Sequence, residues 1–184
     1  MHTKEQLDAN IALCVHSAML MADGTLPDFQ AVVHPSAVNR EAKDEPPASR
    51  GLGPRAYYAT ALWLREAFAD LRFEVHEAIA RDDLVAVHLT MSGVHAGDMI
   101  DFDAEANVAH VFPPTGKRFA ATHSHWFRVA DGMVIEHWAN RDDLGTALQL
   151  GWVPPSPRYL LRSALAKRRA IARFRRDPDT YLEP

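Results

Sequence analysis

The chain has 184 residues and a formal net charge of −4, with 47% hydrophobic and 24% charged residues. A chain of this length can bury about 70% of its unfolded surface in one domain, and this balance excludes disordered, collagen-like and membrane-spanning proteins. Cys14 is the single cysteine, which excludes an internal disulfide framework and a cysteine-rich zinc module. The first residues lack the apolar stretch of a secretory signal, and we expect a cytoplasmic protein.

Charge is distributed unevenly along the sequence. Residues 155–184 hold 8 Lys/Arg and 3 Asp/Glu, a charge of +5, whereas residues 1–154 hold 12 Lys/Arg and 21 Asp/Glu, a charge of −9. We therefore predict a main domain over 1–154 and a basic C-terminal helical extension over 155–184.

The N-terminal third is predicted to be helical. Apolar residues recur at helical spacing over 4–22, and a short second helix follows over 26–33. Cys14 lies in the apolar stripe of the first helix, which indicates a core residue rather than a nucleophile. The polar, proline-containing segment 34–53 is expected to be a loop, and loops of that length often cover functional sites. A third helix with one broad apolar face begins at Pro54.

Antiparallel strands are predicted to follow the helices. Alternating apolar residues mark four strands, at 72–80, 84–92, 118–129 and 133–140. Asp131-Gly132 is a hairpin signal between the last two, and 98–116 is expected to be irregular. Asp142 is a suitable N-cap for a short helix that ends before Gly151. Helices followed by antiparallel strands indicate the α+β class.

The basic extension is predicted to form one more helix. Ser156 is a suitable N-cap, Pro157 suits the first helical position, and Asp177-Pro178 ends the helix. Its apolar stripe favours packing on the main domain or on a second subunit. We expect no nucleic-acid partner and no membrane partner.

Two histidines on one predicted strand are the most informative chemical feature. His123 and His125 alternate within 118–129, so they share the apolar, core-facing side of that strand. Burial among apolar groups keeps an imidazole neutral, and a neutral imidazole can act as general acid or general base. Two alternatives are core histidines bonded to backbone groups, or a metal site completed by His137. The register of the hairpin decides which residues of the partner strand join the pair.

Six short motifs occur between residues 5 and 153. They are Gly53-Pro54, Leu71-Arg72-Phe73-Glu74-Val75, Pro113-Pro114-Thr115-Gly116-Lys117, Phe127-Arg128-Val129-Ala130-Asp131-Gly132, Glu136-His137-Trp138 and Asp142-Asp143-Leu144-Gly145. Together they resemble the SnoaL-like polyketide cyclases of the nuclear transport factor 2-like superfamily. Residues 98–112 form a longer connection than is usual in that family, and the basic extension lies outside the resemblance.

The resemblance implies a cone-shaped α+β fold in which a curved antiparallel sheet wraps around helices, with an apolar pocket, usually in a dimer. It also implies ring closure by intramolecular aldol condensation without cofactor or metal, using an acidic residue and a nearby histidine. His125 matches that histidine and His123 the polar residue two positions before it. The position of the acid is Ala139, which cannot transfer a proton, and Asp142 matches a second family acid.

We therefore predict this α+β fold with an extra C-terminal helix, and cofactor-independent acid/base chemistry (aldol cyclisation or isomerisation) on a small, apolar, carbonyl-bearing ligand. His125 and His123 are the predicted catalytic residues. The predicted substrate-binding residues are Trp138, Asn140, His137, Trp63 and Tyr57. No cofactor and no metal are expected, and a homodimer is expected. Because of Ala139, the alternative is a noncatalytic ligand-binding or dimerisation module.

Overall fold

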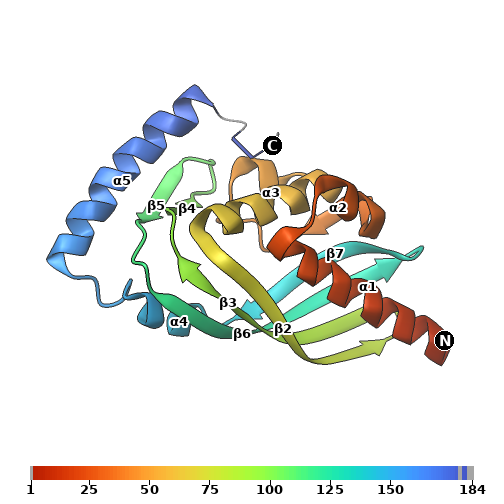
Figure 1. Ribbon diagram of the computed structural model, residues 1–184. Coiled ribbons are helices and arrows are strands. Elements are labelled where there is room, and N and C mark those ends of the chain that lie inside the picture. Colours follow the sequence, from red (N-terminus) through yellow and green to blue (C-terminus); the bar gives the residue numbers. More distant parts are fainter. Residues whose placement is uncertain (1, 178–179, 182–184) are drawn as a thin grey trace.

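The structure, a computed structural model, describes residues 2–177, 180 and 181. Five strands form the main sheet: β1 (Val33–Asn39), β2 (Phe68–Arg81), β3 (Leu84–His95), β6 (Arg118–Ala130) and β7 (Met133–Arg141). Their order is β1-β7-β6-β3-β2, in which β1 pairs with β7 in parallel and all other neighbours are antiparallel. Figure 1 shows the long strands curving beneath the N-terminal helices.

Three helices cover one face of this sheet: α1 (Lys4–Asp23), α2 (Leu26–Val32) and α3 (Gly53–Ala67) (Figure 1). Arg65 of α3 fixes the end of α1, because its guanidinium donates hydrogen bonds to the carbonyl oxygens of Leu20, Met21 and Gly24. Gly53 begins α3 with a φ of 74°, and a β-carbon there would collide with the backbone of Pro35. This close approach requires glycine and ties the start of α3 to β1.

A smaller layer lies at one end of the sheet. It consists of the hairpin β4 (Met99–Phe102) and β5 (Val108–Phe112), with α5 (Pro157–Arg176) packed over it (Figure 1). Ala166 and Ala170 of α5 are buried against the hairpin, in a second hydrophobic core with Ile100, Phe102, Val108 and Val111. Ile171 and Phe174 of the predicted apolar stripe thus pack on the same chain. Leu160, Leu161 and Leu165 of that stripe are exposed instead.

Two predictions about irregular segments are wrong. The segment 34–53 contains most of β1 and a 3-10 turn, η1 (Pro47–Arg50), and 98–116 contains β4 and β5. Pro35 obscured β1, but an edge strand tolerates proline because one side of its ladder is unpaired. The short strands β4 and β5 offer too few residues for alternation to be recognised.

The other predicted elements are confirmed within a few residues. Ser156 accepts a hydrogen bond from the backbone of Tyr159 and caps α5. Asp142 likewise accepts from the backbone of Gly145 and caps α4 (Asp143–Leu150). Cys14 is fully buried in the main core, as predicted. Pro178, expected to follow the last helix, lies outside the described residues, and the division of the chain after residue 154 stays a prediction.

Phe174 offers a test of how much α5 stabilises the β4–β5 layer. Its ring meets that of Phe102 edge to face, with centroids 4.9 Å apart. Because Phe174 is only partly buried, Phe174→Ala should lower the free energy of unfolding by about 2 to 3 kcal/mol, less than full burial would give. Chemical denaturation measures this, with the exposed Arg175→Ala as control. Equal stability of the two variants would contradict the packing role of α5.

Candidate functional site

The hairpin between β6 and β7 determines which side chains face the interior. Asp131 and Gly132 form the predicted tight turn, with φ of 52° and 73°. Ala130 pairs with Met133 next to the turn, but farther along the strands the pairing shifts by one residue. The shift inserts Ile135 as an extra residue in β7, which is a β-bulge.

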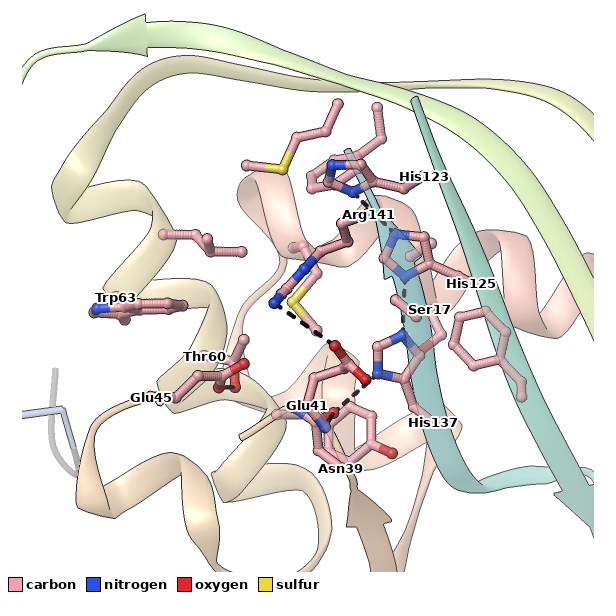
Figure 2. A pocket seen from close by; sticks show the side chains of 18 residues that line it. Ser17, Asn39, Glu41, Glu45, Thr60, Trp63, His123, His125, His137 and Arg141 are labelled. Carbon is pink, nitrogen blue, oxygen red and sulfur yellow. Dashed lines mark hydrogen bonds and ion pairs between the residues drawn. The ribbon is translucent and has the colours of Figure 1, made fainter. Parts of the chain in front are cut away.

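Beyond the bulge, three pairs of residues lie side by side on the inner face. They are Phe127 with His137, His125 with Ala139, and His123 with Arg141. Paired residues in neighbouring strands point to the same face, so both predicted catalytic histidines share that face with His137. Figure 2 shows the three imidazoles in a row along the sheet side of the pocket.

The structure does not bring Trp138 and Asn140 to this pocket. Their side chains lie on the opposite face of β7, where the indole of Trp126 stacks at 6.3 Å on that of Trp138 and donates a 3.2 Å hydrogen bond to Asn140. The bulge is the reason. Without it, the same turn would pair Trp138 with His125 and Asn140 with His123.

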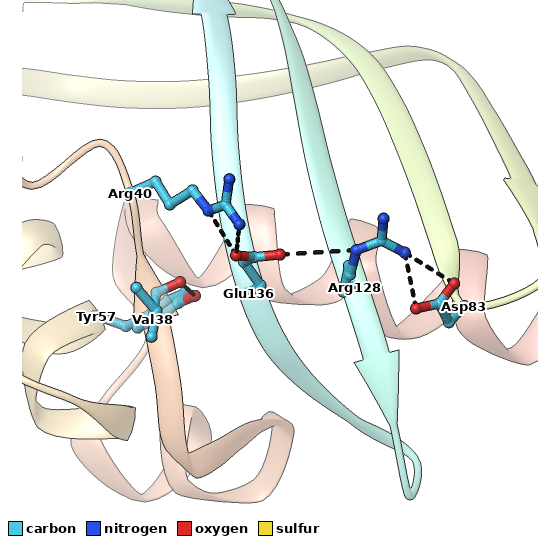
Figure 3. Close-up of polar contacts among 6 residues, drawn as sticks. All are labelled: Val38, Arg40, Tyr57, Asp83, Arg128 and Glu136. Atoms are coloured by element: carbon cyan, nitrogen blue, oxygen red, sulfur yellow. Dashed lines mark hydrogen bonds and ion pairs between the residues drawn. The ribbon is translucent and has the colours of Figure 1, made fainter.

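Glu136 also faces away from the pocket. Its carboxylate binds the guanidinium groups of Arg40 and Arg128, and Arg128 continues to Asp83 at 2.8 Å (Figure 3). Although Glu136 directly precedes His137 in sequence, it is therefore engaged on the outer face and does not serve as the acid partner of the histidines.

Two adjoining cavities lie on the inner face of the sheet. Helices α1 and α3 cover the inner one, and α3, the β4–β5 hairpin and α4 border the outer one. The inner chamber has a volume of about 70 Å³ and the outer chamber about 340 Å³. Both chambers are lined by Glu41, Glu45, Trp63, Leu64, Met91, His123 and Arg141. These shared residues mark the junction, so a ligand in the outer chamber meets polar groups there, while His125 and His137 line the inner chamber alone.

The predicted residues Trp63 and Tyr57 are at the pocket, but their polar atoms are already used. The Trp63 indole N–H donates to the carbonyl of Ile100 at 2.8 Å, and the Tyr57 hydroxyl donates to the carbonyl of Val38 at 3.0 Å (Figure 3). Both side chains therefore present flat aromatic surface to the cavity. Such walls suit an apolar ligand.

The three histidines form a hydrogen-bonded chain that ends on Asn39. His123 Nδ1 and His125 Nε2 are 3.4 Å apart, His125 Nδ1 and His137 Nε2 are 2.9 Å apart, and His137 Nδ1 lies 3.0 Å from Asn39 Oδ1. The backbone N–H of Glu41 also donates to Asn39 Oδ1, at 3.2 Å, which fixes that atom as an acceptor.

This anchor assigns the proton of each ring. His137 must carry its proton on Nδ1 to donate to Asn39, so its Nε2 accepts from His125 Nδ1. The same logic makes His125 Nε2 the acceptor for His123 Nδ1. Within the described residues, no group hydrogen-bonds to His123 Nε2. The chain therefore leaves one basic nitrogen unpaired, on the histidine that lies at the junction.

Electrostatics keep all three rings neutral. Desolvation, aided by the charge of Arg141, lowers the pKa of His123 to about 4 and that of His137 to about 3. Burial also holds the pKa of His125 well below its usual value, and the neighbouring histidines add to the effect. At neutral pH the row is uncharged, as the apolar placement of His123 and His125 predicted.

Three charged residues of the site were missed by sequence reasoning. Glu41 and Glu45 belong to the segment that follows β1, and Arg141 ends β7 and forms an ion pair with Glu41 at 3.6 Å (Figure 2). Arg141 shares its face with His137 and Ala139, so alternation along β7 would have identified it once the register was known. The carboxylates lie in a segment without periodicity, and only its length indicated a role.

The histidine row does not have the arrangement of a metal site. In the part of the chain that the structure describes, no group of three or more His, Cys, Asp or Glu residues is arranged to hold a metal ion. The three imidazoles hydrogen-bond to one another in a row instead of converging on one point. Among the described helices, none is long and apolar enough to cross a membrane.

The curved sheet, the covering helices and the enclosed pocket together define an α+β cone of the nuclear transport factor 2-like class. The solved structure of TsrD from Streptomyces laurentii shares this fold, with a TM-score of 0.64 at 20% identity over 82% of this chain and 98% of that one. The family model for SnoaL-like polyketide cyclase matches residues 15–150.

Two relatives of known activity extend the match. The aklanonic acid methyl ester cyclase DnrD of Streptomyces peucetius is 30% identical over 135 residues, which cover 73% of this chain and 85% of the relative. The nogalonic acid methyl ester cyclase of Streptomyces nogalater is 27% identical over 129 residues, which cover 70% and 87%. The chain belongs to the SnoaL-like polyketide cyclase family. This confirms the predicted fold and class, and the noncatalytic alternative is not favoured.

The buried histidine row predicts a specific dependence of stability on pH. A histidine whose folded pKa lies near 3, below the ordinary 6.5, contributes its full stability above pH 6.5 and loses it as pH falls toward 3. His137→Gln removes one such group. Between pH 6.5 and 4, its free energy of unfolding should therefore fall less steeply than the parent's, by up to about 1.4 kcal/mol per pH unit.

Urea unfolding at stepped pH measures these slopes. The exposed His110, changed to glutamine, provides the control and should follow the parent. Parallel curves for His137→Gln and the parent would show that His137 is not held neutral in the folded protein.

Proposed function

We propose that this protein closes a ring in a polyketide by intramolecular aldol condensation, without a cofactor. The substrate class we propose is a methyl ester of a polyketide acid, of the kind named for the two relatives. The observation that carries the proposal is the neutral histidine row, which ends in one unpaired basic nitrogen where the two chambers meet.

His123 is the proposed general base. Aldol closure begins when a proton leaves a carbon next to a carbonyl group, and the lone pair of His123 Nε2 is free to accept it. Each ring behind His123 donates through Nδ1 to the next, so the developing positive charge is shared along the row. His125 acts through His123 and holds it in the required tautomer, a role that refines the catalytic assignment predicted for His125.

Arg141 is proposed to stabilise the enolate that forms in this step. Its guanidinium lines both chambers and lies across the junction from the helices, held by Glu41 at 3.6 Å and by Asp143 at 3.4 Å. A fixed positive charge beside the oxygen that gains negative charge lowers the barrier most in a site shielded from water. Trp63 and Tyr57 provide apolar walls for the substrate.

Activity of the His123→Gln variant tests this proposal. Glutamine keeps a hydrogen-bonding side chain but has no basic nitrogen, so kcat for cyclisation should fall by about 100-fold or more. His125→Ala should lower it less than His123→Gln. The assay follows conversion of aklanonic acid methyl ester and nogalonic acid methyl ester, with His110→Gln as the control. Parental turnover by His123→Gln would exclude His123 as the base.

We also propose a homodimer that forms through the outer face of the main sheet. That face carries the stacked pair Trp126 and Trp138, and Ile79 on it is 66% exposed. Both indole rings are half-buried, and together with the exposed Ile79 they form an apolar surface that favours a protein interface. We propose the cytoplasm as its location, with which the free thiol of Cys14 is compatible.

Sedimentation tests the dimer. The parent should sediment with about twice the 20.5 kDa of one chain, and Trp138→Glu should shift it to the monomer because it buries an unpaired charge in the interface. Arg175→Ala, on the distant face of α5, should leave the mass unchanged. A monomeric parent would contradict this proposal without affecting the proposed chemistry.

A further inference from the structure

A buried carboxyl group faces the histidine row from the other side of the cavity. Glu45 belongs to the segment between β1 and α3 and is only 3% exposed, yet its side chain lines both chambers. Figure 2 shows it entering from the helix side, beside Thr60 and Trp63, while the histidines enter from the sheet. Glu45 and His123 thus lie on opposite walls of the same junction.

The backbone around Glu45 is fixed by neighbouring elements. The Arg50 guanidinium donates a hydrogen bond to the carbonyl oxygen of Glu45 at 3.1 Å. The N–H of Phe102, at the end of β4, donates to the carbonyl of Asp44 at 3.0 Å. The β4–β5 hairpin therefore covers this segment and helps to exclude water from the carboxyl group.

The contacts of Thr60 indicate which form of the carboxyl group fits the site. The Thr60 hydroxyl has one proton but two acceptors within reach, Glu45 Oε2 in a short contact and the carbonyl of Ala56 at 3.3 Å. If Glu45 is protonated, it donates to Thr60, and Thr60 in turn donates to Ala56. Only the neutral acid satisfies both hydrogen bonds at once.

We propose that Glu45 is the catalytic acid that protonates the carbonyl oxygen during ring closure. This assignment rests on the proposed cyclase function and adds a residue to it. The inner positions of β7 at the pocket are His137, Ala139 and Arg141, none of which is an acid, and Glu45 offers a carboxyl group from the opposite wall of the pocket.

The step balances without an added reactant. His123 Nε2 takes a proton from the carbon next to one carbonyl group, and that carbon forms a bond to the carbon of a second carbonyl group. The π bond of the second carbonyl breaks toward its oxygen, which receives the proton of Glu45 and becomes a hydroxyl group. The proton on the imidazolium of His123 then returns to the Glu45 carboxylate through water as the product leaves. No electron is gained or lost.

The electrostatic surroundings support a protonated Glu45. Desolvation raises the pKa of Glu45 to about 7, and the negative charge of Glu41 raises it further. The hydrogen bond from Thr60 and the positive charge of Arg141 lower it. The titratable and charged groups that line the two chambers around Glu45 are Glu41, Asp44, Tyr57, Asp101, His123, His125, His137, Arg141 and Asp143. Glu45 is therefore available as an acid up to about neutral pH.

The test compares Glu45→Gln with a matched carboxyl variant. Asp98→Asn removes another desolvated carboxyl group, one whose pKa is also raised by burial but which lies outside both chambers. In the assay with the two methyl esters, Glu45→Gln should lower kcat by about 100-fold or more, and Asp98→Asn should stay within about threefold of the parent. Glu45→Asp, which retains an acid, should keep more activity than Glu45→Gln at matched thermal stability.

The pH profile of kcat/KM separates an acid from a structural residue. The parent should lose activity as pH rises through about 7, when Glu45 ionises, and as pH falls through about 4, when His123 is protonated. Glu45→Gln should lose the alkaline limb and keep the acidic one. An alkaline limb that is unchanged in Glu45→Gln would overturn the proposed role of Glu45. So would a near-parental kcat of Glu45→Gln when His123→Gln is inactive, and either result would leave the cyclase proposal intact. A parent without turnover of either ester would overturn the cyclase proposal and this one with it.

Discussion

A single extra residue in β7 controls the chemistry of this pocket. Because side chains alternate between the faces of a strand, the bulge at Ile135 decides which residues of β7 share the interior with His123 and His125. With the bulge, the interior receives His137, Ala139 and Arg141. In the register that the tight turn would give alone, the interior would instead receive Glu136, Trp138 and Asn140. Neither the row of three histidines nor the positive charge would then exist.

A row of buried imidazoles is stable only if each polar atom finds a partner. Burial penalises the charged forms, so the rings are neutral, and a neutral imidazole carries one donor and one acceptor. Asn39 accepts at one end of the row, and each ring then satisfies the next. Among the described residues, the one ring nitrogen of the row that is left without a hydrogen-bond partner is Nε2 of His123. The arrangement that stabilises the fold therefore also leaves a basic atom where a ligand can reach it.

Local patterns predicted most of the fold but only part of the site. Helical spacing, alternation and caps such as Ser156 and Asp142 depend on neighbours in sequence, and the structure confirms them. The sequence likewise predicted that His123 and His125 share one face of their strand, because residues two positions apart on a strand point to the same side. The inward placement of Arg141 and the burial of Glu45 depend on a bulge and on a distant hairpin, which no local pattern encodes.

Glu45, the β4–β5 hairpin and the C-terminal helix are physically connected in this chain. Residues 98–112 form the β4–β5 hairpin, and α5 packs on that hairpin. The hairpin in turn bonds to the backbone beside Glu45 and covers it. A carboxyl group needs such a cover to remain protonated near neutral pH, since exposure to water would favour its ionised form. The hairpin and the helix that packs on it thus help to keep the helix wall of the pocket in the dry environment that a neutral Glu45 requires.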